Sequence, residues 1–536
     1  MTHPQLVHFE PVAGPTASAF CRLVTRKHGV RSVSAACDDA DGRPLKALAE
    51  FDYAKVELCV PVIADELHGA DFGDRRLSNR LALIGEVLAR APWKSFPQAA
   101  VAAADLQALY RFLGNERVEP GAILQPHFVR TVERCARIKK VLVAHDSTHF
   151  KFTDREGLGR LRADKDLGFF AHISIAINAD PTRQPLGVLG FKTWARPKHK
   201  RRKTSTGRKK SAADYAKLTD KESSRWLQQI RAVAEQVGDQ AQVVHIMDRE
   251  ADYFWLIAEL QQPGCAQSFV IRLTHDRNAR QDDTMPWEKV RQIVGRAEDV
   301  CQVEVPISSR KASKIPGKRK TFPARQGRMA RLRYAATRIE LKCPKYLTQY
   351  PKTIAVNVVR AYEVDVPDGL EPVEWLLLTT EPIDTPEQVR LVVEYYRARW
   401  LIEEFNKALK TGCAAEQRQL QDYEALCNAI AIFLPIAWQM LLLRTLAAQN
   451  PNAPAECVLE PEQIEVLRAF GPEKLPEHPT VGQALLAVAR LGGFIHQRNR
   501  KPGWQTLGRG MQELVSLTAG WVAGWKAREK CLGPSA

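Results

Sequence analysis

The 536-residue sequence predicts an α/β protein whose central sheet is interrupted by a β-rich insertion and flanked by helical regions. Three observations lead to this class. Short apolar runs typical of buried strands alternate with helical stretches between residues 139 and 273. Residues 387–411 contain neither Pro nor Gly and repeat their apolar positions with a helical period. The 78 Lys and Arg outnumber the 61 Asp and Glu, and the resulting net charge of +17 indicates a polyanionic partner.

The elements of the central part follow a definite order. Strands are expected at 139–146, 168–178 and 185–194, then a helix at 223–237, a strand at 242–248, a helix at 251–260 and a strand at 268–273. This is the order of a ribonuclease-H-like fold, in which the first and fourth strands lie side by side in the middle of the sheet. Asp146 and Asp248 end these two strands, so both carboxylates are expected at one edge of the sheet. Taken singly, each is equally an ordinary turn residue.

The remaining chain divides by composition and period. Residues 1–55 have no sustained period and are expected to be either a poorly ordered extension or the product of an upstream start codon. The expected domains are this extension, a helical domain at 56–135, the two parts of the core at 136–273 and 381–449, the inserted β-rich subdomain at 274–380, and a C-terminal helical region at 450–536.

No segment is predicted to cross a membrane. Residues 425–443 are uncharged over a length that approaches a bilayer span, but Asn428, Pro435 and Gln439 interrupt them, so a buried core helix is expected. The eleven cysteines are dispersed without zinc-like spacing, which indicates reduced thiols in the cytoplasm. The N-terminus lacks the basic and apolar segments of a secretory signal.

The positive charge is concentrated in two runs. Residues 196–210 carry nine Lys or Arg and residues 305–333 carry ten, and neither run contains an acidic residue. Such runs are common in solvated loops, but two in one chain favour binding to nucleic acid. An anionic membrane surface is the weaker alternative, because neither run lies on an amphipathic helix.

The helix expected at 387–412 has two different faces. At about 100° per residue, one arc of about 60° gathers a phenol, two cations and a carboxylate, and the opposite side is apolar. A solvated helix surface would show the same charges. The polar arc contains Tyr396, Arg399, Glu403 and Lys410, and the apolar side contains Leu401, Phe405, Ala408 and Leu409.

The spacing Tyr-x2-Arg-x3-Glu-x6-Lys on this helix resembles the signature of the bacterial cut-and-paste transposases of the insertion-sequence-four group. HDSTHF at 145–150 and DREADYFWL at 248–256 resemble the first and second aspartate motifs of that family. FVIRLTHDR at 269–277 resembles a segment that contacts DNA. The resemblance is collinear over roughly residues 54–525.

The resemblance implies an Asp-Asp-Glu metal site made of Asp146, Asp248 and Glu403, which binds Mg²⁺ and accepts Mn²⁺ in its place. Carboxylates suit such hard cations, and two ions can activate the attacking oxygen and relieve charge on the departing one. The family also implies DNA contacts, although several of these residues have an ordinary structural or surface reading as well. They are Tyr396, Arg399 and Lys410 at the scissile phosphate, Trp375 stacked on a flipped base, Arg272 and Arg277 in the core, and Arg75 and Arg76 in the helical domain that binds the transposon end.

The activity implied by the resemblance is cleavage of transposon ends through a DNA hairpin, followed by strand transfer into target DNA. The implied assembly is a homodimer that holds two ends in the bacterial cytoplasm, at the nucleoid when DNA is bound. Residues 491–521 are apolar enough for a dimer contact or for packing onto their own chain. Two other functions stay open: a ribonuclease-H-like nuclease that cleaves without joining, and a DNA-binding relic without catalysis.

Overall fold

The computed structural model describes residues 63–532 except 91, 101, 162–165, 198–221, 264–266, 308, 310–311, 315–320, 323, 368, 473 and 496–501. It also describes three short strands near the N-terminus, β1 (Phe9–Val12), β2 (Phe20–Leu23) and β3 (Cys37–Asp39). The rest of the extension expected at 1–55, and most of the basic run at 196–210, lie outside the described residues.

Five strands make the core of the sheet, in the order β9-β8-β4-β6-β7. β4 and β8 are parallel, as are β8 and β9, whereas β4 and β6, and β6 and β7, are antiparallel. The expectation that the first and fourth strands lie side by side is therefore confirmed. The bounds are β4 (Lys140–Phe152), β5 (Gly159–Arg160), β6 (Leu167–Asn178), β7 (Pro185–Trp194), β8 (Gln242–Met247) and β9 (Ser268–Arg272).

The first strand is longer than expected. β4 continues six residues beyond Asp146 to Phe152, so Asp146 lies within a strand and not at its end. The extra residues stay paired with β6, where Phe150 faces Phe169 and both rings are buried. Pairing with β8 stops at Ala144. Asp146 therefore lies where β4 has lost its neighbour on one side, and the hydrophobic pairing on the other side explains the extra length.

The insertion is β-rich as expected, and it extends the core sheet. Its last strand, β17, pairs antiparallel with β9, which brings Leu377 beside Arg272. The sheet then continues through β16, β15, β10 and β11. The bounds are β10 (Asn278–Arg280), β11 (Glu288–Lys289), α9 (Val290–Gly295), β12 (Asp299–Ile307), β13 (Ser313–Lys314), β14 (Thr321–Phe322), β15 (Arg328–Lys342), β16 (Thr353–Val364) and β17 (Glu374–Thr379).

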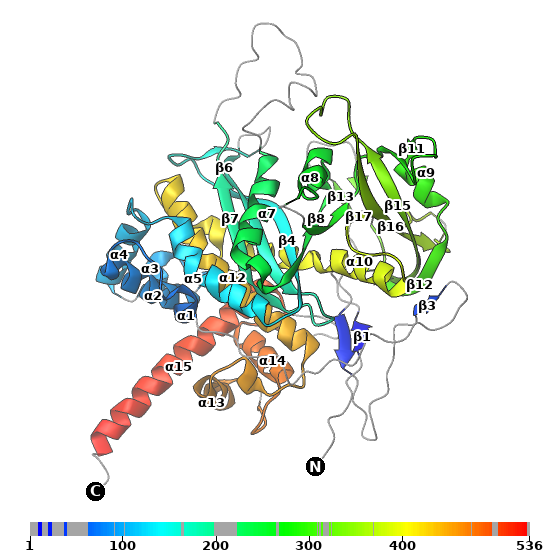
Figure 1. Ribbon diagram of the computed structural model, residues 1–536. Helices are drawn as coiled ribbons and strands as arrows, with labels where there is room; N and C mark the ends of the chain where they lie inside the picture. Colours follow the sequence, from blue (N-terminus) through cyan, green and yellow to red (C-terminus); the bar gives the residue numbers. More distant parts are fainter. Residues whose placement is uncertain are drawn as a thin grey trace.

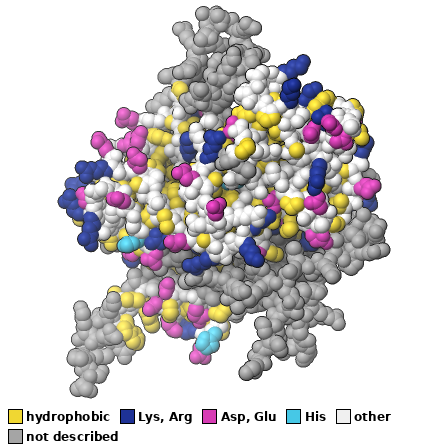
Figure 2. Space-filling view, in the orientation of Figure 1, with side chains coloured by type: hydrophobic (Ala, Val, Ile, Leu, Met, Phe, Trp, Pro, Cys, Tyr) yellow, Lys and Arg dark blue, Asp and Glu magenta, His cyan; other side chains and the backbone are white. Residues whose placement is uncertain are grey.

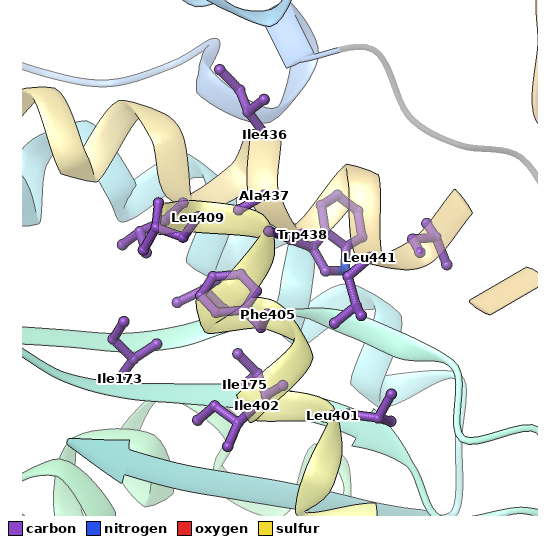
Figure 3. Packing of buried hydrophobic residues seen from close by; sticks show 14 of the residues in the cluster. Ile173, Ile175, Leu401, Ile402, Phe405, Leu409, Ile436, Ala437, Trp438 and Leu441 are labelled. Carbon is purple, nitrogen blue, oxygen red and sulfur yellow. The ribbon is translucent and has the colours of Figure 1, made fainter. Parts of the chain in front are cut away.

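Helices cover the core sheet on both faces (Figure 1). On one face, α7 and the end of α5 pack on alternating residues such as Val141 and Val143. On the other, Ile173 and Ile175 of β6 meet the apolar sides of α11 and α12 (Figure 3). The bounds are α5 (Pro120–Ala136), α7 (Ser224–Val237), α8 (Phe254–Glu259), α10 (Pro386–Ala398), α11 (Trp400–Lys407) and α12 (Tyr423–Gln449).

The helix expected at 387–412 is divided into three segments. α10 begins at a capping box, in which Thr385 accepts from the Gln388 N–H and the Gln388 side chain accepts from the Thr385 N–H. Tightened i to i+3 bonds around Arg399 separate α10 from α11. The last turn, η4 (Ala408–Gly412), is a π-helix closed by the Cys413 N–H on the Ala408 carbonyl at 2.8 Å. The expected apolar side is buried, and the chain ends its helix at Gly412 as predicted.

The two regions expected to be helical, 56–135 and 450–536, contain helices: α1–α5 in the first, and α13, α14 and α15 in the second. α12 has the length and apolar composition of a membrane span, but 89% of its apolar window is buried inside the protein, which agrees with a core helix. The bounds are α1 (Ile63–Leu67), α2 (Arg75–Arg90), α3 (Phe96–Ala99), α4 (Ala103–Leu113), α13 (Pro461–Phe470), α14 (Val481–Leu491) and α15 (Trp504–Leu532).

The C-terminal helix α15 is half packed and half extended. Trp504, Leu507 and Leu514 are buried against their own chain. The second half of α15 projects from the body of the protein (Figure 1). There Trp521 is 38% exposed and makes an edge contact with Phe470 of α13. The first half therefore packs onto its own chain, and any partner surface is restricted to the second half.

Candidate active site

The two aspartates lie at the same end of two parallel strands. Ala144 of β4 pairs with Ile246 of β8, and Asp146 and Asp248 each follow two residues later. Asp248 caps the short 3-10 turn η3 (Arg249–Ala251), and its side chain accepts the Glu250 N–H at 2.8 Å. Parallel register thus brings residues far apart in the sequence to one edge of the sheet.

Glu403 reaches the same place from α11, which packs against β4. The link is Arg399, at the junction of α10 and α11. Its Nη2 lies 3.1 Å from Glu403 Oε1, and its Nη1 lies 4.0 Å from Asp146 Oδ1. One guanidinium therefore lies between a carboxylate on the helix and a carboxylate on the strand.

Electrostatics show that the three acidic residues are close neighbours. Burial, together with the negative charges of Glu403 and Asp248, raises the pKa of Asp146 to about 7, and Arg399 opposes this shift only in part. Burial also disfavours the charged form of Arg399, but Tyr396, Asp146 and Glu403 outweigh it and raise the pKa of Arg399. The site therefore has surplus negative charge that a cation would relieve.

Asn406 is a site residue that the sequence analysis missed. Its Nδ2 donates to Asp146 Oδ2 at 2.9 Å. Its Oδ1 is buried and has no hydrogen-bond partner among the described residues, and the same holds for Arg399 Nη1. A usable signal was present, because Asn406 follows Glu403 by three residues and so shares its side of the helix.

The metal expectation can be tested on these donors. Among the described residues, no group of three or more His, Cys, Asp and Glu side chains is arranged to hold a metal ion. Each acidic side chain instead has a donor from the chain: Asn406 for Asp146, the Glu250 N–H for Asp248 and Arg399 for Glu403. In chemistry alone, the donors suit Mg²⁺, which needs few protein ligands and prefers carboxylates.

The other residues of the predicted polar arc surround this centre. Tyr396 is buried, and its ring makes an edge contact with Trp375 of β17 at 5.6 Å between centroids. Lys410, on the π turn, donates to the His149 carbonyl at 2.5 Å and lies 4.0 Å from Glu416. Burial lowers the pKa of Lys410. The structure thus brings the half-buried Trp375 against the buried Tyr396.

The two arginines predicted at the end of β9 have different surroundings. Arg272 makes no ion pair or side-chain hydrogen bond within the described part of the chain. It lies close to Arg249, whose pKa is lowered by burial and, to a smaller extent, by the positive charge of Arg272. Arg277, in contrast, pairs with the buried carboxylate of Asp252 at 2.5 Å. Arg249, which was not predicted, has no such partner either among the described residues. Arg272 and Arg249 are therefore available to an anion, and Arg277 is engaged internally.

Behind Asp146, a buried polar network supports β4. Because side chains alternate along a strand, His145 points to the opposite face from Asp146. His145 Nε2 lies 2.8 Å from His245 Nδ1, and Ser174 Oγ lies 2.8 Å from His145 Nδ1. Burial lowers the pKa of His245 to about 4, so this ring is neutral at pH 7. The network ties together β4, β6 and β8 at the level of the site.

A basic surface covers the N-terminal helices. Figure 2 shows Lys and Arg side chains gathered at the left edge, over α2–α4 in the orientation of Figure 1. Arg75 and Arg76 are both exposed there, and Arg76 pairs with Asp74 at 3.1 Å. The exposed arginines of this region are Arg75, Arg76, Arg90, Arg111 and Arg117. An open hollow of about 570 Å³ lies elsewhere, between the insertion and the α8–β9 segment of the core, and no predicted site residue lines it.

The helices that carry this basic surface match a known family of domains. Residues 61–118 match the family model described as Transposase DNA-binding, so α1–α4 correspond to a DNA-binding domain of transposases. This match supports a DNA transposase, and DNA as its partner. Among solved structures, a cryo-EM structure of the piggyBac transposase synaptic complex with hairpin DNA is similar over 86% of this chain and 74% of that chain. Its sequence identity is 9% and its TM-score 0.34, a level at which the likeness carries no further weight.

Proposed function

We propose that this protein is a cut-and-paste DNA transposase with an Asp-Asp-Glu active site in a ribonuclease-H-like core. The observation that carries the proposal is the meeting of Asp146, Asp248 and Glu403 around Arg399, in a chain whose N-terminal helices match a transposase DNA-binding domain. The strand order β9-β8-β4-β6-β7, with β4 and β8 parallel, supports the fold assignment.

Asp146, Asp248 and Glu403 would hold Mg²⁺, or Mn²⁺ in its place. The chemistry that such ions supply is activation of a water or 3′-hydroxyl and relief of charge on the departing oxygen. The protein's own part is to keep Asp146 oriented through Asn406 and to hold Glu403 beside it on a short, buried helix. The surplus negative charge described above favours cation binding.

The cations around the site would hold the DNA backbone. The buried Nη1 of Arg399 makes no hydrogen bond among the described residues, although it lies 4.0 Å from Asp146, and its N–H groups suit a phosphate oxygen. Lys410 supplies a positive charge from the π turn. Arg272 and Arg249 have no carboxylate partner among the described residues and extend the positive surface along the sheet edge. Trp375 would stack on a base flipped from the duplex end during hairpin formation, next to Tyr396.

Arg75 and Arg76 on α2 would contact the transposon end, because both are exposed on the matched DNA-binding domain. The working form would be a homodimer that pairs two ends and transfers them into target DNA. The exposed Trp521 on the projecting half of α15 is a candidate contact for this dimer. The protein would act in the bacterial cytoplasm, at the nucleoid when bound to DNA.

A plasmid that carries the gene with its native flanking DNA tests the proposal. The purified protein with Mg²⁺ should release the segment between the flanking inverted repeats and join it to a second plasmid, and EDTA should stop both steps. Joined products whose two ends are both inserted distinguish a transposase from the second candidate. If the plasmid stays intact in both Mg²⁺ and Mn²⁺, the proposal is wrong.

The second candidate is a ribonuclease-H-like nuclease that cleaves without joining. It is favoured by the same acidic cluster, which by itself supports only metal-dependent phosphoryl transfer. Linear products without any joined DNA, formed in the same assay, would identify it.

A further inference from the structure

Next to Glu403 in the sequence lies a second glutamate with very different surroundings. Glu404 points about 100° further around α11 and is only 8% exposed. Its Oε1 accepts from Lys407 Nζ at 2.7 Å, and its Oε2 accepts from Arg444 Nη1 and from Trp504 Nε1, both at 3.1 Å. One buried carboxylate therefore receives three donors.

These donors come from three different elements. Lys407 belongs to α11 itself, Arg444 to the core helix α12, and Trp504 is the first residue of the C-terminal helix α15. Arg444 also lies over the Trp504 ring, 4.5 Å from its centroid, so that its charge contacts both the carboxylate and the indole. Gly508 of α15 also lies close to the end of η4. A Cβ added at Gly508 would lie 3.5 Å from the Gly412 carbonyl oxygen.

α11 needs such support from its surroundings. It has eight residues, and it lies between the tightened turn at Arg399 and the π turn η4, so few backbone hydrogen bonds of its own set its position. Its apolar residues Leu401, Phe405 and the following Leu409 fix one side (Figure 3). The carboxylate of Glu404 is the polar contact that fixes its rotation toward α12 and α15.

We propose that Glu404 is a positioning residue that makes the placement of Glu403 depend on the docking of α15 through Trp504. The C-terminal region thereby regulates the active site: when α15 is docked, α11 presents Glu403 and Asn406 to Asp146, and when α15 is released, this side of the site loosens. The inference rests on the proposed function for its catalytic meaning, and its structural part stands on the contacts alone.

The test is a matched pair of tryptophan substitutions in the full-length protein. Trp504→Phe removes the indole donor to Glu404 and keeps an aromatic ring beneath Arg444. Trp438→Phe is the control, because the Trp438 Nε1 donates to a buried acceptor, the Pro185 carbonyl, at 2.9 Å and Arg134 lies 4.4 Å over its ring. Each variant therefore loses one buried indole hydrogen bond from a ring that a guanidinium covers. Only Trp504 donates its hydrogen bond to α11.

The first readout is amide hydrogen exchange of the peptide that covers α11 and η4, measured by mass spectrometry without DNA or metal. Trp504→Phe should raise exchange there about tenfold, as expected for losing one hydrogen bond to a charged acceptor. Trp438→Phe should leave this peptide unchanged. Equal exchange in the two variants would overturn the positioning role. Should Trp504→Phe not fold, Glu404→Gln, which keeps an acceptor for the indole but removes the charge, should give the same local increase.

The second readout is cleavage of the plasmid that carries the gene and its flanks. Trp504→Phe should lower kcat about tenfold at unchanged KM and raise the Mg²⁺ concentration needed for half-maximal rate, and Trp438→Phe should do neither. A proportional loss in both variants would mean general destabilisation and would refute the inference. If the wild-type protein fails to cleave, the proposed function is wrong, and hydrogen exchange alone then decides whether Glu404 holds α11.

Discussion

The two sides of α11 differ in how completely their polar atoms are paired. On the Glu404 side, one buried carboxylate is satisfied by Lys407, Arg444 and Trp504. On the Glu403 side, carboxylates crowd one another, and Asn406 Oδ1 and Arg399 Nη1 are buried without a hydrogen bond among the described residues, although Arg399 Nη1 lies 4.0 Å from Asp146. Buried polar groups are normally paired, so atoms left unpaired beside like charges indicate where a ligand belongs. The comparison separates the candidate site residues from the residues that hold α11 in place.

A similar contrast recurs at the end of β9. Arg277 is held by Asp252, whose other oxygen accepts the Thr274 and His275 N–H groups. Arg272 has no such partner in the described part of the chain. The arginine engaged within the chain maintains the fold of the loop, and the unengaged one is the candidate DNA contact.

The largest effect on the cleavage rate is expected for substitutions of the three acidic residues, compared with Glu404→Gln. Asp146→Asn, Asp248→Asn and Glu403→Gln should each slow cleavage about a thousandfold or more, because groups that act on the transition state have effects of this size. Binding to a transposon-end duplex in gel shifts should stay close to wild type, since affinity comes mainly from Lys and Arg. Glu404→Gln should cost about tenfold. A Glu403→Gln variant that nicks as fast as Glu404→Gln would remove Glu403 from the site.

The raised pKa of Asp146 predicts a pH effect on stability in the absence of metal. Between the ordinary value of 3.8 and the folded value of about 7, the unfolded chain is ionised at Asp146 and the folded chain is protonated. The folded state then binds more protons, so its free energy of unfolding falls as pH rises through this window and levels off above about 7. The contribution is at most about 4 kcal/mol at 1.36 kcal/mol per pKa unit.

Asp146→Asn removes this titration. Its free energy of unfolding, relative to wild type, should therefore rise between pH 4.5 and pH 8, as measured by urea unfolding in EDTA. Mg²⁺ should stabilise the wild type more at pH 8 than at pH 5, because the ionised carboxylate is the ligand. An Asp166→Asn variant, at an exposed ion pair with Lys151, serves as the control and should show little change. A difference that does not vary with pH would contradict the raised pKa.

Asn406→Ala tests whether the hydrogen bond from Asn406 to Asp146 contributes to cleavage. Losing a hydrogen bond to a charged acceptor should slow cleavage about tenfold to a hundredfold, with DNA binding unchanged. Asn428→Ala is the matched control, because this buried amide donates to the Leu113 and Val118 carbonyls away from the site. It should lower the thermal midpoint without slowing cleavage below that temperature. Equal rate losses in both variants would assign Asn406 a structural role only.

Trp375→Ala tests whether the half-buried ring beside Tyr396 serves DNA or the core. First-strand nicking should stay near wild type, and hairpin formation should fall about tenfold, in line with 1–3 kcal/mol for a stacked base. An abasic nucleotide at the flipped position should restore part of the hairpin product. If both steps fall together along with the thermal midpoint, the ring is a core aromatic.

The smallest effect separates Arg272, at the end of β9, from Arg277 in the loop that follows it. Arg272→Ala should weaken DNA binding about fivefold, lower the salt slope by about one, and leave the thermal midpoint unchanged. Arg277→Ala should lower the thermal midpoint instead, because it leaves the buried carboxylate of Asp252 without its cation. Gel shifts at several salt concentrations and thermal unfolding distinguish the two. The reverse pattern would show that pairing within the chain does not predict the DNA contacts here.

The sequence by itself predicted most of the core elements and gave a hypothesis for the chemistry of the site. Alternating apolar runs predicted the core strands and most of the helices, and the acidic residues at 146, 248 and 403 were identified from their motifs. Local patterns suffice here, because the side-chain period of a strand or helix and the nature of a carboxylate are properties of short segments. The boundaries were less accurate: β4 extends past Asp146 because pairing with β6 over Phe150 stabilises it, and a long-range pairing leaves little local signal.

Only the tertiary structure decided which residues share the site and which support it. The sequence predicted a role for Glu403 and none for Glu404, and it predicted Arg272 and Arg277 alike as DNA contacts. Their difference depends on partners contributed by distant segments: Arg444 and Trp504 for Glu404, and Asp252 for Arg277. Burial and pairing are properties of the packed chain, and the free energy of an ionised group depends on both, so the roles of these residues follow from their tertiary contacts.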